Sequence, residues 1–169
     1  MKNILFFGGG NIAQALISGL LLYGVNNKNI FFIDRNPLNQ KKLDNLKVKS
    51  LKKSGSDIDL IILSVKPKDA IKAYKEILNN YKNPKIISLV AGIKSSTFTK
   101  LSKKTEFMRA MPNTASKYGQ GITALYNSSF KKSNFKKVSS IFSKLGKVIE
   151  VDNDSKIDIF TGVIGSGPA

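Results

Sequence analysis

The sequence predicts an α/β fold in which helices cover both faces of a doubly wound, mostly parallel sheet. Short apolar runs alternate along the chain with amphipathic segments of about ten residues. Runs such as 59–65 lack the polar alternation of a half-exposed strand, so both faces of the sheet are expected to be covered. The intervening helices are long enough for the right-handed crossovers that join parallel strands.

Individual elements follow from apolar spacing, helix starts and turns. Continuous apolar runs predict strands, and apolar residues that recur every third or fourth position predict helices. Pro37 suits the first position of a helix with Asn36 as its N-cap, and Gly146 suits a C-cap. In chain order we predict a strand at 4–7, a helix at 12–21, a strand at 29–34, a helix at 37–45, a short strand at 48, a turn at 54–56, a strand at 59–65, a helix from 67 to 78, a strand at 85–90, a short helix at 96–101, strands at 106–110 and 122–126, a helix at 134–145, a strand at 147–151 and a helix at 152–161.

The composition narrows the class of protein. A chain of 169 residues suits one domain with a real core. It contains no cysteine and no histidine, which excludes a disulfide scaffold and a thiolate zinc site, and we expect no bound metal. No apolar segment reaches the ~18 residues of a membrane span, and Gly-Gly-Gly-Asn interrupts the N-terminal apolar run. We therefore expect neither a membrane span nor a signal peptide, and a cytoplasmic location.

The formal net charge of +17 raises the question of a nucleic-acid or membrane partner. Of the 28 Lys and Arg residues only Arg35 and Arg109 are arginine, and the lysines are spread over nearly every helix and loop. The densest group flanks one predicted helix, at Lys131, Lys132, Lys136 and Lys137. We therefore expect no nucleic-acid or membrane partner, although the positive field would attract an anionic dinucleotide or a carboxylate.

Residues 8–13, Gly-Gly-Gly-Asn-Ile-Ala, fit the pattern G-x-G-x-x-A between a strand and a helix. Gly8 permits the tight turn, Gly10 lets a pyrophosphate approach the backbone, and Ala13 allows close packing of the helix on the strand. The free N–H groups of the helix start would face the phosphates. Asp34, 24 residues after Gly10, is close to the ~20 expected for the acid that binds ribose. The pattern favours a Rossmann-type dinucleotide site over a plain structural turn.

Ligands of open parallel sheets bind beyond the carboxyl ends of the strands. Four predicted strand ends carry unusual residues there, with a possible fifth. Each has an ordinary structural explanation by itself, such as an exposed lysine at Lys66, but their position at one edge of the sheet favours a binding site. These ends are 8–12, 34–36, 64–67, 89–92 and, as the possible fifth, 111–113.

Several strings resemble pyrroline-5-carboxylate reductase, in order and at similar spacing over the whole chain. Met-Pro-Asn-Thr and Gly-Ser-Gly-Pro-Ala are far more specific than the glycine turn. The strings are Phe7 to Ala13, Val65 to Pro67, Ser88 to Ile93, Arg109 to Thr114, Gly121 to Leu125 and Gly165 to Ala169.

This resemblance implies that reduced NADP or NAD donates a hydride to the C=N bond of the small-molecule substrate 1-pyrroline-5-carboxylate and gives L-proline. A protonated imine accepts hydride readily, so the lack of histidine is no objection, and the catalytic residue stays unknown. The implied cofactor-binding residues are Phe7, Gly8, Gly9, Gly10, Asn11, Ile12, Asp34, Arg35, Asn36, Ser64, Val65, Lys66, Pro67, Leu89, Val90 and Ala91. The implied substrate-side residues are Met111, Pro112, Asn113, Ser166 and Gly167.

The resemblance also implies a domain organisation. Residues 1–152 would form the dinucleotide-binding domain, and 153–169 would begin the connection into a helical dimerisation domain that family members carry beyond this point. The sequence stops at Ala169. We therefore expect a homo-oligomer for a full-length protein, whereas this chain alone should bind dinucleotide weakly and reduce the imine negligibly. Ile164 stands where the family usually has Ser.

Several alternatives stay open. Arg109 is either a partner for the substrate carboxylate or an exposed arginine at a strand end. Asp34 directed into the ribose site would favour NADH, whereas Arg35 over the adenine edge would admit NADPH. The rival functions are another nicotinamide oxidoreductase such as a hydroxyacid dehydrogenase, a non-catalytic dinucleotide-binding module or sensor, and a basic nucleic-acid binder.

Overall fold

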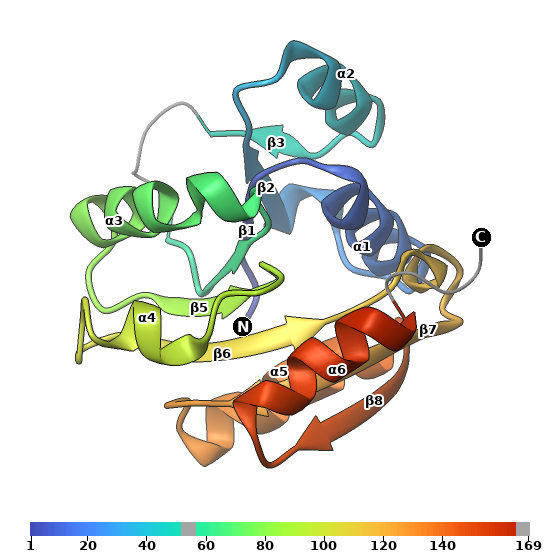
Figure 1. The fold of residues 1–169 in the computed structure, drawn as a ribbon. Helices are drawn as coiled ribbons and strands as arrows, with labels where there is room; N and C mark the ends of the chain where they lie inside the picture. The colour runs from blue at the N-terminus through green and yellow to red at the C-terminus, as the bar shows by residue number, and fades with distance from the viewer. Residues whose placement is uncertain (52–56, 165–169) are drawn as a thin grey trace.

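The computed structural model describes residues 1–51 and 57–164, which contain one eight-stranded sheet with the order β3-β2-β1-β4-β5-β6-β7-β8 (Figure 1). The strands are β1 Ile4–Phe7, β2 Ile30–Ile33, β3 Lys49–Ser50, β4 Leu60–Leu63, β5 Lys85–Ser88, β6 Glu106–Met111, β7 Gly121–Asn127 and β8 Gly146–Val151. The α-helices are α1 Asn11–Leu22, α2 Pro37–Asn45, α3 Ala70–Asn80, α4 Ser95–Thr99, α5 Lys132–Ser143 and α6 Asp154–Ile164. Short 3-10 helices are η1 Asn27–Asn29, η2 Pro67–Asp69 and η3 Thr114–Tyr118. The predicted turn at 54–56 lies outside the described residues.

Alternate residues of each strand point to opposite faces of the sheet and build separate apolar clusters. On one face, α1, α2 and α5 pack against strand residues such as Phe6 and Met108. On the other face, α3 and α4 pack against Leu5 and Phe107. On this second face α6 also covers β6 and β7, through Ile157 (Figure 1). The predicted α/β fold with helices on both faces is confirmed. No helix in the described ranges is long and apolar enough to cross a membrane.

One strand pair departs from the parallel arrangement among the described strands. β7 runs antiparallel to β6, and every other neighbouring pair is parallel. Only residues 112–120, which include η3, separate these two strands. A parallel crossover needs about a dozen residues or more, so the chain turns back instead. The longer connection through α5 then makes β8 parallel to β7. The prediction of a mostly parallel sheet is confirmed with this exception.

The start of α2 matches the sequence prediction and the end of α5 does not. Pro37 occupies the first position of α2, and the Asn36 side chain accepts a hydrogen bond from the Leu38 N–H at 2.9 Å. The predicted C-cap at Gly146 is wrong, because the C-cap of α5 is Lys144. Gly146 instead opens β8 with φ 137°, where a Cβ would overlap the backbone of its strand partner in β7. Glycine is needed there because two backbones approach closely.

A buried ion-pair network around Arg109 of β6 fastens α6 to the sheet. The Arg109 side chain is fully buried and donates to the carboxylates of Asp154 at 2.6 Å and Asp158 at 2.7 Å. Asp154 also accepts from the backbone N–H and hydroxyl of Ser95 in α4, at 2.7 and 2.8 Å. Both predicted roles of Arg109 are therefore wrong: the side chain is not exposed, and its guanidinium is already paired within the fold.

The surroundings of Asp154 make this network sensitive to acid. Burial alone would raise the pKa of Asp154, but hydrogen bonds from Arg109 and Ser95 outweigh burial and hold the pKa below its ordinary value. A carboxyl group with a lower pKa in the folded state stabilises the fold at pH values above its unfolded pKa. This stabilisation is present at neutral pH and is lost as the pH falls below about 4.

Replacing Arg109 by Met is expected to lower the free energy of unfolding at pH 7 by about 3 kcal/mol. This is the lower end of the range for removing one partner of a buried ion pair, because Asp154 keeps its two donors from Ser95. At about pH 3 the difference from wild type should shrink, because the stabilisation that comes from the lowered pKa of Asp154 declines once the pH falls below the ordinary value of about 4. Urea unfolding at the two pH values measures both effects.

Lys156→Met serves as the control, because it removes an exposed ion pair from the same helix. Lys156 contacts Asp152 at 2.6 Å, and both side chains are more than half exposed. Exposed pairs contribute little, so this variant should unfold nearly as wild type does. Equal losses in the two variants, or no loss in Arg109→Met, would contradict the proposed importance of the network.

Candidate functional site

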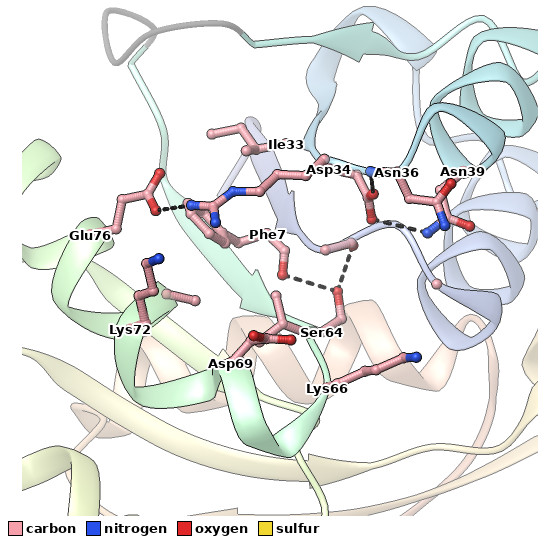
Figure 2. A pocket seen from close by; sticks show the side chains of 15 residues that line it. Phe7, Ile33, Asp34, Asn36, Asn39, Ser64, Lys66, Asp69, Lys72 and Glu76 are labelled. Carbon is pink, nitrogen blue, oxygen red and sulfur yellow. Dashed lines mark hydrogen bonds and ion pairs between the residues drawn. The ribbon is translucent and has the colours of Figure 1, made fainter.

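A pocket of about 300 Å³ lies at the carboxyl ends of β1, β2 and β4 (Figure 2). β1 separates β2 from β4 in the sheet, so the pocket sits where the strand order reverses, the usual ligand position in an open α/β sheet. The structure brings three of the predicted loops together there. The predicted site residues that line it are Phe7, Gly8, Gly10, Asp34, Arg35, Asn36, Ser64, Val65 and Lys66.

Gly8 follows β1 directly and contacts Ser64, the residue that follows β4. The Gly8 N–H donates to the Ile33 carbonyl at 2.8 Å, and the Ser64 hydroxyl donates to the Gly8 carbonyl at 2.8 Å. Its φ of +107° lies in the region that favours glycine, and a Cβ there would lie 2.6 Å from the Ser64 carbonyl oxygen. Gly8 therefore serves the tight turn that the sequence predicts and also the contact between neighbouring strand ends.

Asp34 binds the glycine turn with its carboxylate. Oδ2 accepts from the Gly9 N–H at 2.5 Å and from the Asn39 side-chain amide at 3.2 Å, while Oδ1 accepts from the Asn36 N–H at 2.6 Å. An ionised carboxylate offers about four acceptor positions, so about one remains for a hydroxyl in the pocket. Asp34 thus lies at the wall where a ribose-binding acid is expected, while most of its hydrogen-bonding capacity holds the loop in place.

The start of α1 presents backbone N–H groups to open space. Gly10 is the N-cap, and no side chain caps this helix end within the described part of the chain. A Cβ on Gly10 would meet no atom within 4 Å. The first N–H groups of a helix lack partners inside the helix and carry the positive end of its dipole. This arrangement suits an anionic group such as a phosphate.

Charged side chains of both signs line the pocket. The Arg35 guanidinium and the Glu76 carboxylate form an ion pair at 2.9 Å that joins the loop after β2 to α3. Both side chains are accessible, with relative exposures of 74% and 37%. Figure 2 shows Glu76 and Lys72 on the α3 side of the pocket, across from Asp34 and Asn36. The charged residues that line the pocket are Asp34, Arg35, Lys66, Asp69, Lys72 and Glu76.

η2 and α3 contribute a wall of the pocket that was not predicted from the sequence. This wall follows directly after the predicted loop 64–67. Its residues recur every three or four positions, so they share one helical face, and that spacing was a usable signal. The missed residues that line the pocket are Asp69, Lys72, Ala73 and Glu76, together with Ile33 and Asn39 on the opposite side.

The other predicted site residues that the structure describes do not line this pocket. Leu89 and Val90 are buried, and Ala91 packs against the apolar cluster of Met111. The Asn113 side chain accepts from the Ile122 N–H at 3.1 Å, which fixes the loop after β6. The roles predicted for these residues stay predictions. Pro112 is buried. Four residues are neighbours in sequence of pocket residues but do not line the pocket: Gly9, Asn11, Ile12 and Pro67. Ser166 and Gly167 lie outside the described residues.

Residues 3–92 match the family described as NADP oxidoreductase, coenzyme F420-dependent. This match covers more than half of the chain. The chain belongs to this family. The part that matches the oxidoreductase family runs from β1 through the loop after β5, so it includes the glycine turn, the Asp34 loop and the α3 wall of the pocket.

Similar proteins support the resemblance predicted from the motifs. A pyrroline-5-carboxylate reductase of Mycobacterium tuberculosis is 33% identical over 181 residues, which cover 100% of this chain and 61% of the relative. A solved reductase structure of the same name from Coxiella burnetii has a TM-score of 0.87 and 28% identity, covering 99% of this chain and 65% of that one. A pyrroline carboxylate reductase of Plasmodium falciparum, solved with NADP bound, has a TM-score of 0.88 at 21% identity and is evidence of the fold alone; it covers 99% of this chain and 63% of that one. The chain therefore spans about three-fifths of the length of these relatives.

Gly8→Ala is expected to destabilise the fold by about 3 kcal/mol. A side chain at a positive φ is strained, and the added Cβ would collide with the backbone of Ser64. Urea unfolding of the variant measures the loss.

Gly10→Ala is the matched control, with an expected change below about 1 kcal/mol. Its φ of −68° is ordinary for any residue, and the added Cβ would project into open space. A Gly8→Ala protein as stable as the Gly10→Ala protein would contradict the close contact between Gly8 and the backbone of Ser64.

Proposed function

We propose that this chain supplies the dinucleotide-binding part of an NAD(P)H-dependent reductase that converts 1-pyrroline-5-carboxylate to L-proline. The observation that carries the proposal is the pocket at the strand-order reversal, in which the glycine turn, Asp34 and the open start of α1 lie together. The M. tuberculosis relative is a pyrroline-5-carboxylate reductase, which supports the substrate, and membership of an NADP oxidoreductase family supports a nicotinamide cofactor.

The residues of the pocket fit such a cofactor. The open space before Gly10 and the uncapped N–H groups of α1 would receive the pyrophosphate. The remaining acceptor position of Asp34 would hold a ribose hydroxyl, with Arg35 and Asn36 beside the adenosine. The loop that begins at Ser64 would follow the cofactor towards its nicotinamide half, for which the resemblance names Leu89, Val90 and Ala91.

The reaction would require this part of the protein to bind and orient the dinucleotide. The reduced nicotinamide supplies a hydride when it is bound. The chain's own residues would hold the dinucleotide in one orientation, and a protonated imine would need no further acid from them. Arg109 is committed to Asp154 and Asp158, so the substrate carboxylate would need another partner.

We further propose the domain organisation that the resemblance implies. Residues 1–152 would be the dinucleotide-binding domain, and 153–169 would start the connection to a helical dimerisation domain of a homo-oligomer. The attachment of α6 through Arg109 supports a fixed direction for that connection. Met111, Pro112 and Asn113 would lie on the substrate side with Ser166 and Gly167. The protein would act in the cytoplasm without a nucleic-acid or membrane partner, consistent with lysines that are spread along the whole chain.

Binding and turnover are tested separately. The dissociation constants of the 169-residue chain for NADH and NADPH are measured by calorimetry, with Gly10→Ala as the variant that should keep its stability and lose affinity by about tenfold. Turnover is measured as L-proline formed from 1-pyrroline-5-carboxylate by the chain and by a fusion to the C-terminal part of the M. tuberculosis relative. We expect the chain to bind dinucleotide weakly with negligible turnover, and the fusion to reduce the imine.

Two results would contradict the proposal in different ways. If neither cofactor binds the folded chain, the pocket is not a dinucleotide site. If a folded, cofactor-binding fusion forms no L-proline, the reductase assignment is wrong and the alternative of a dinucleotide-binding module or sensor is favoured.

A further inference from the structure

Arg35 and Glu76, which both line the pocket described above, form an ion pair at 2.9 Å. Arg35 follows β2 directly after Asp34, and Glu76 lies on α3, so the pair links two walls of the same pocket. Both side chains line the pocket and both are accessible to solvent. A ligand that enters therefore meets the only basic side chain of the 34–36 loop already bound to a carboxylate of the protein.

The ion pair lies where the ribose 2′-phosphate of NADPH would bind. Asp34 lies where the ribose hydroxyls of an adenosine are held, and an arginine close to that position is what accommodates a ribose 2′-phosphate. NADPH carries this phosphate and NADH carries a hydroxyl. Arg35 is adjacent to Asp34 in sequence and lines the same pocket, so it is the basic group best placed for the phosphate.

Glu76 would act against the phosphate in two ways. The Glu76 carboxylate is paired with the Arg35 guanidinium that would bind the phosphate. If the phosphate displaced this carboxylate, the negative charge of Glu76 would remain in the same pocket and repel the phosphate. An exposed ion pair is weak, so a phosphate dianion can displace Glu76 and NADPH is not excluded. Asp34 adds a second negative charge at the same place, which already disfavours the phosphate.

We propose that Glu76 is a specificity-determining residue, which competes with the 2′-phosphate of NADPH for Arg35 and thereby shifts the cofactor preference towards NADH. The inference rests on the proposed dinucleotide site and names a residue outside the predicted cofactor loops. A hydroxyl in place of the phosphate makes little demand on Arg35, so binding of NADH leaves the pair intact.

Glu76→Gln tests the proposal, because it removes the charge and keeps the shape of the side chain. The dissociation constants for NADPH and NADH are measured at low salt, where exposed charges are least screened. The NADPH constant is expected to fall by about three- to fivefold and the NADH constant to change by less than about twofold. Adenosine 2′,5′-bisphosphate and AMP, used as probes of the adenosine end alone, should show the same contrast.

Asp69→Asn is the matched control, because Asp69 is another acid that lines the pocket and is not paired with Arg35. It should change the affinities for both cofactors by similar factors. In an Arg35→Gln background, the selective effect of Glu76→Gln on NADPH should shrink, since competition for Arg35 is then gone and only the like charge of Glu76 still acts on the phosphate. Thermal unfolding verifies that each variant is folded.

Several outcomes would overturn the inference. It is wrong if Glu76→Gln changes the dissociation constants of both cofactors equally or changes neither, if Asp69→Asn gives the same selectivity, or if the effect of Glu76→Gln is undiminished without Arg35. In these cases wild type still binds dinucleotide, so the proposed function stands. If wild type binds neither cofactor, the proposed function and this inference both fail.

Discussion

The hydrogen bond from the Gly9 N–H to the Asp34 carboxylate, at 2.5 Å, is the contact on which the site depends. It joins the loop after β1 to the loop after β2 at the point where the strand order reverses. The charge of Asp34 strengthens a bond to a backbone donor beyond that of a neutral acceptor. With the turn held there, the start of α1 is directed at open space, and the Asn39 side chain that reaches the same carboxylate holds α2 beside it.

This arrangement reconciles two demands on one side chain. A ribose-binding acid must be available to a ligand, while a loop anchor must be occupied by the protein. Asp34 meets both because its two oxygens accept from three protein donors and leave about one acceptor position free. The sequence left two alternatives, Asp34 directed into the ribose site or Arg35 lying over the adenine edge. Neither describes the structure fully, since Asp34 lines the pocket while Arg35 forms an ion pair with Glu76 on α3.

The strands and most of the site loops could be predicted from the sequence because their signals are local. Continuous apolar runs marked the buried strands, and glycine spacing marked the turn that the pocket surrounds. Contacts between distant residues left no such signal: the partners of Arg109 lie 45 and 49 residues further along the chain. Gly146 looked like a helix cap, and only its pairing with Gly121 across two strands explains why glycine is required. The residues of the α3 wall recur at helical spacing, which indicates that they share one face of a helix. Nothing in the local sequence showed that this face lies towards the glycine turn.

The central claim is that a dinucleotide binds at the glycine turn and not through the general positive charge of the chain. Amide proton–nitrogen correlation spectra recorded during titration with NADH test it directly. We predict that the largest shifts occur at Gly10, Asn11, Ile12 and the residues after Asp34, with little change in the lysine-rich α5. Shifts spread over α5 and other basic surfaces, or no shift at the start of α1, would contradict the account.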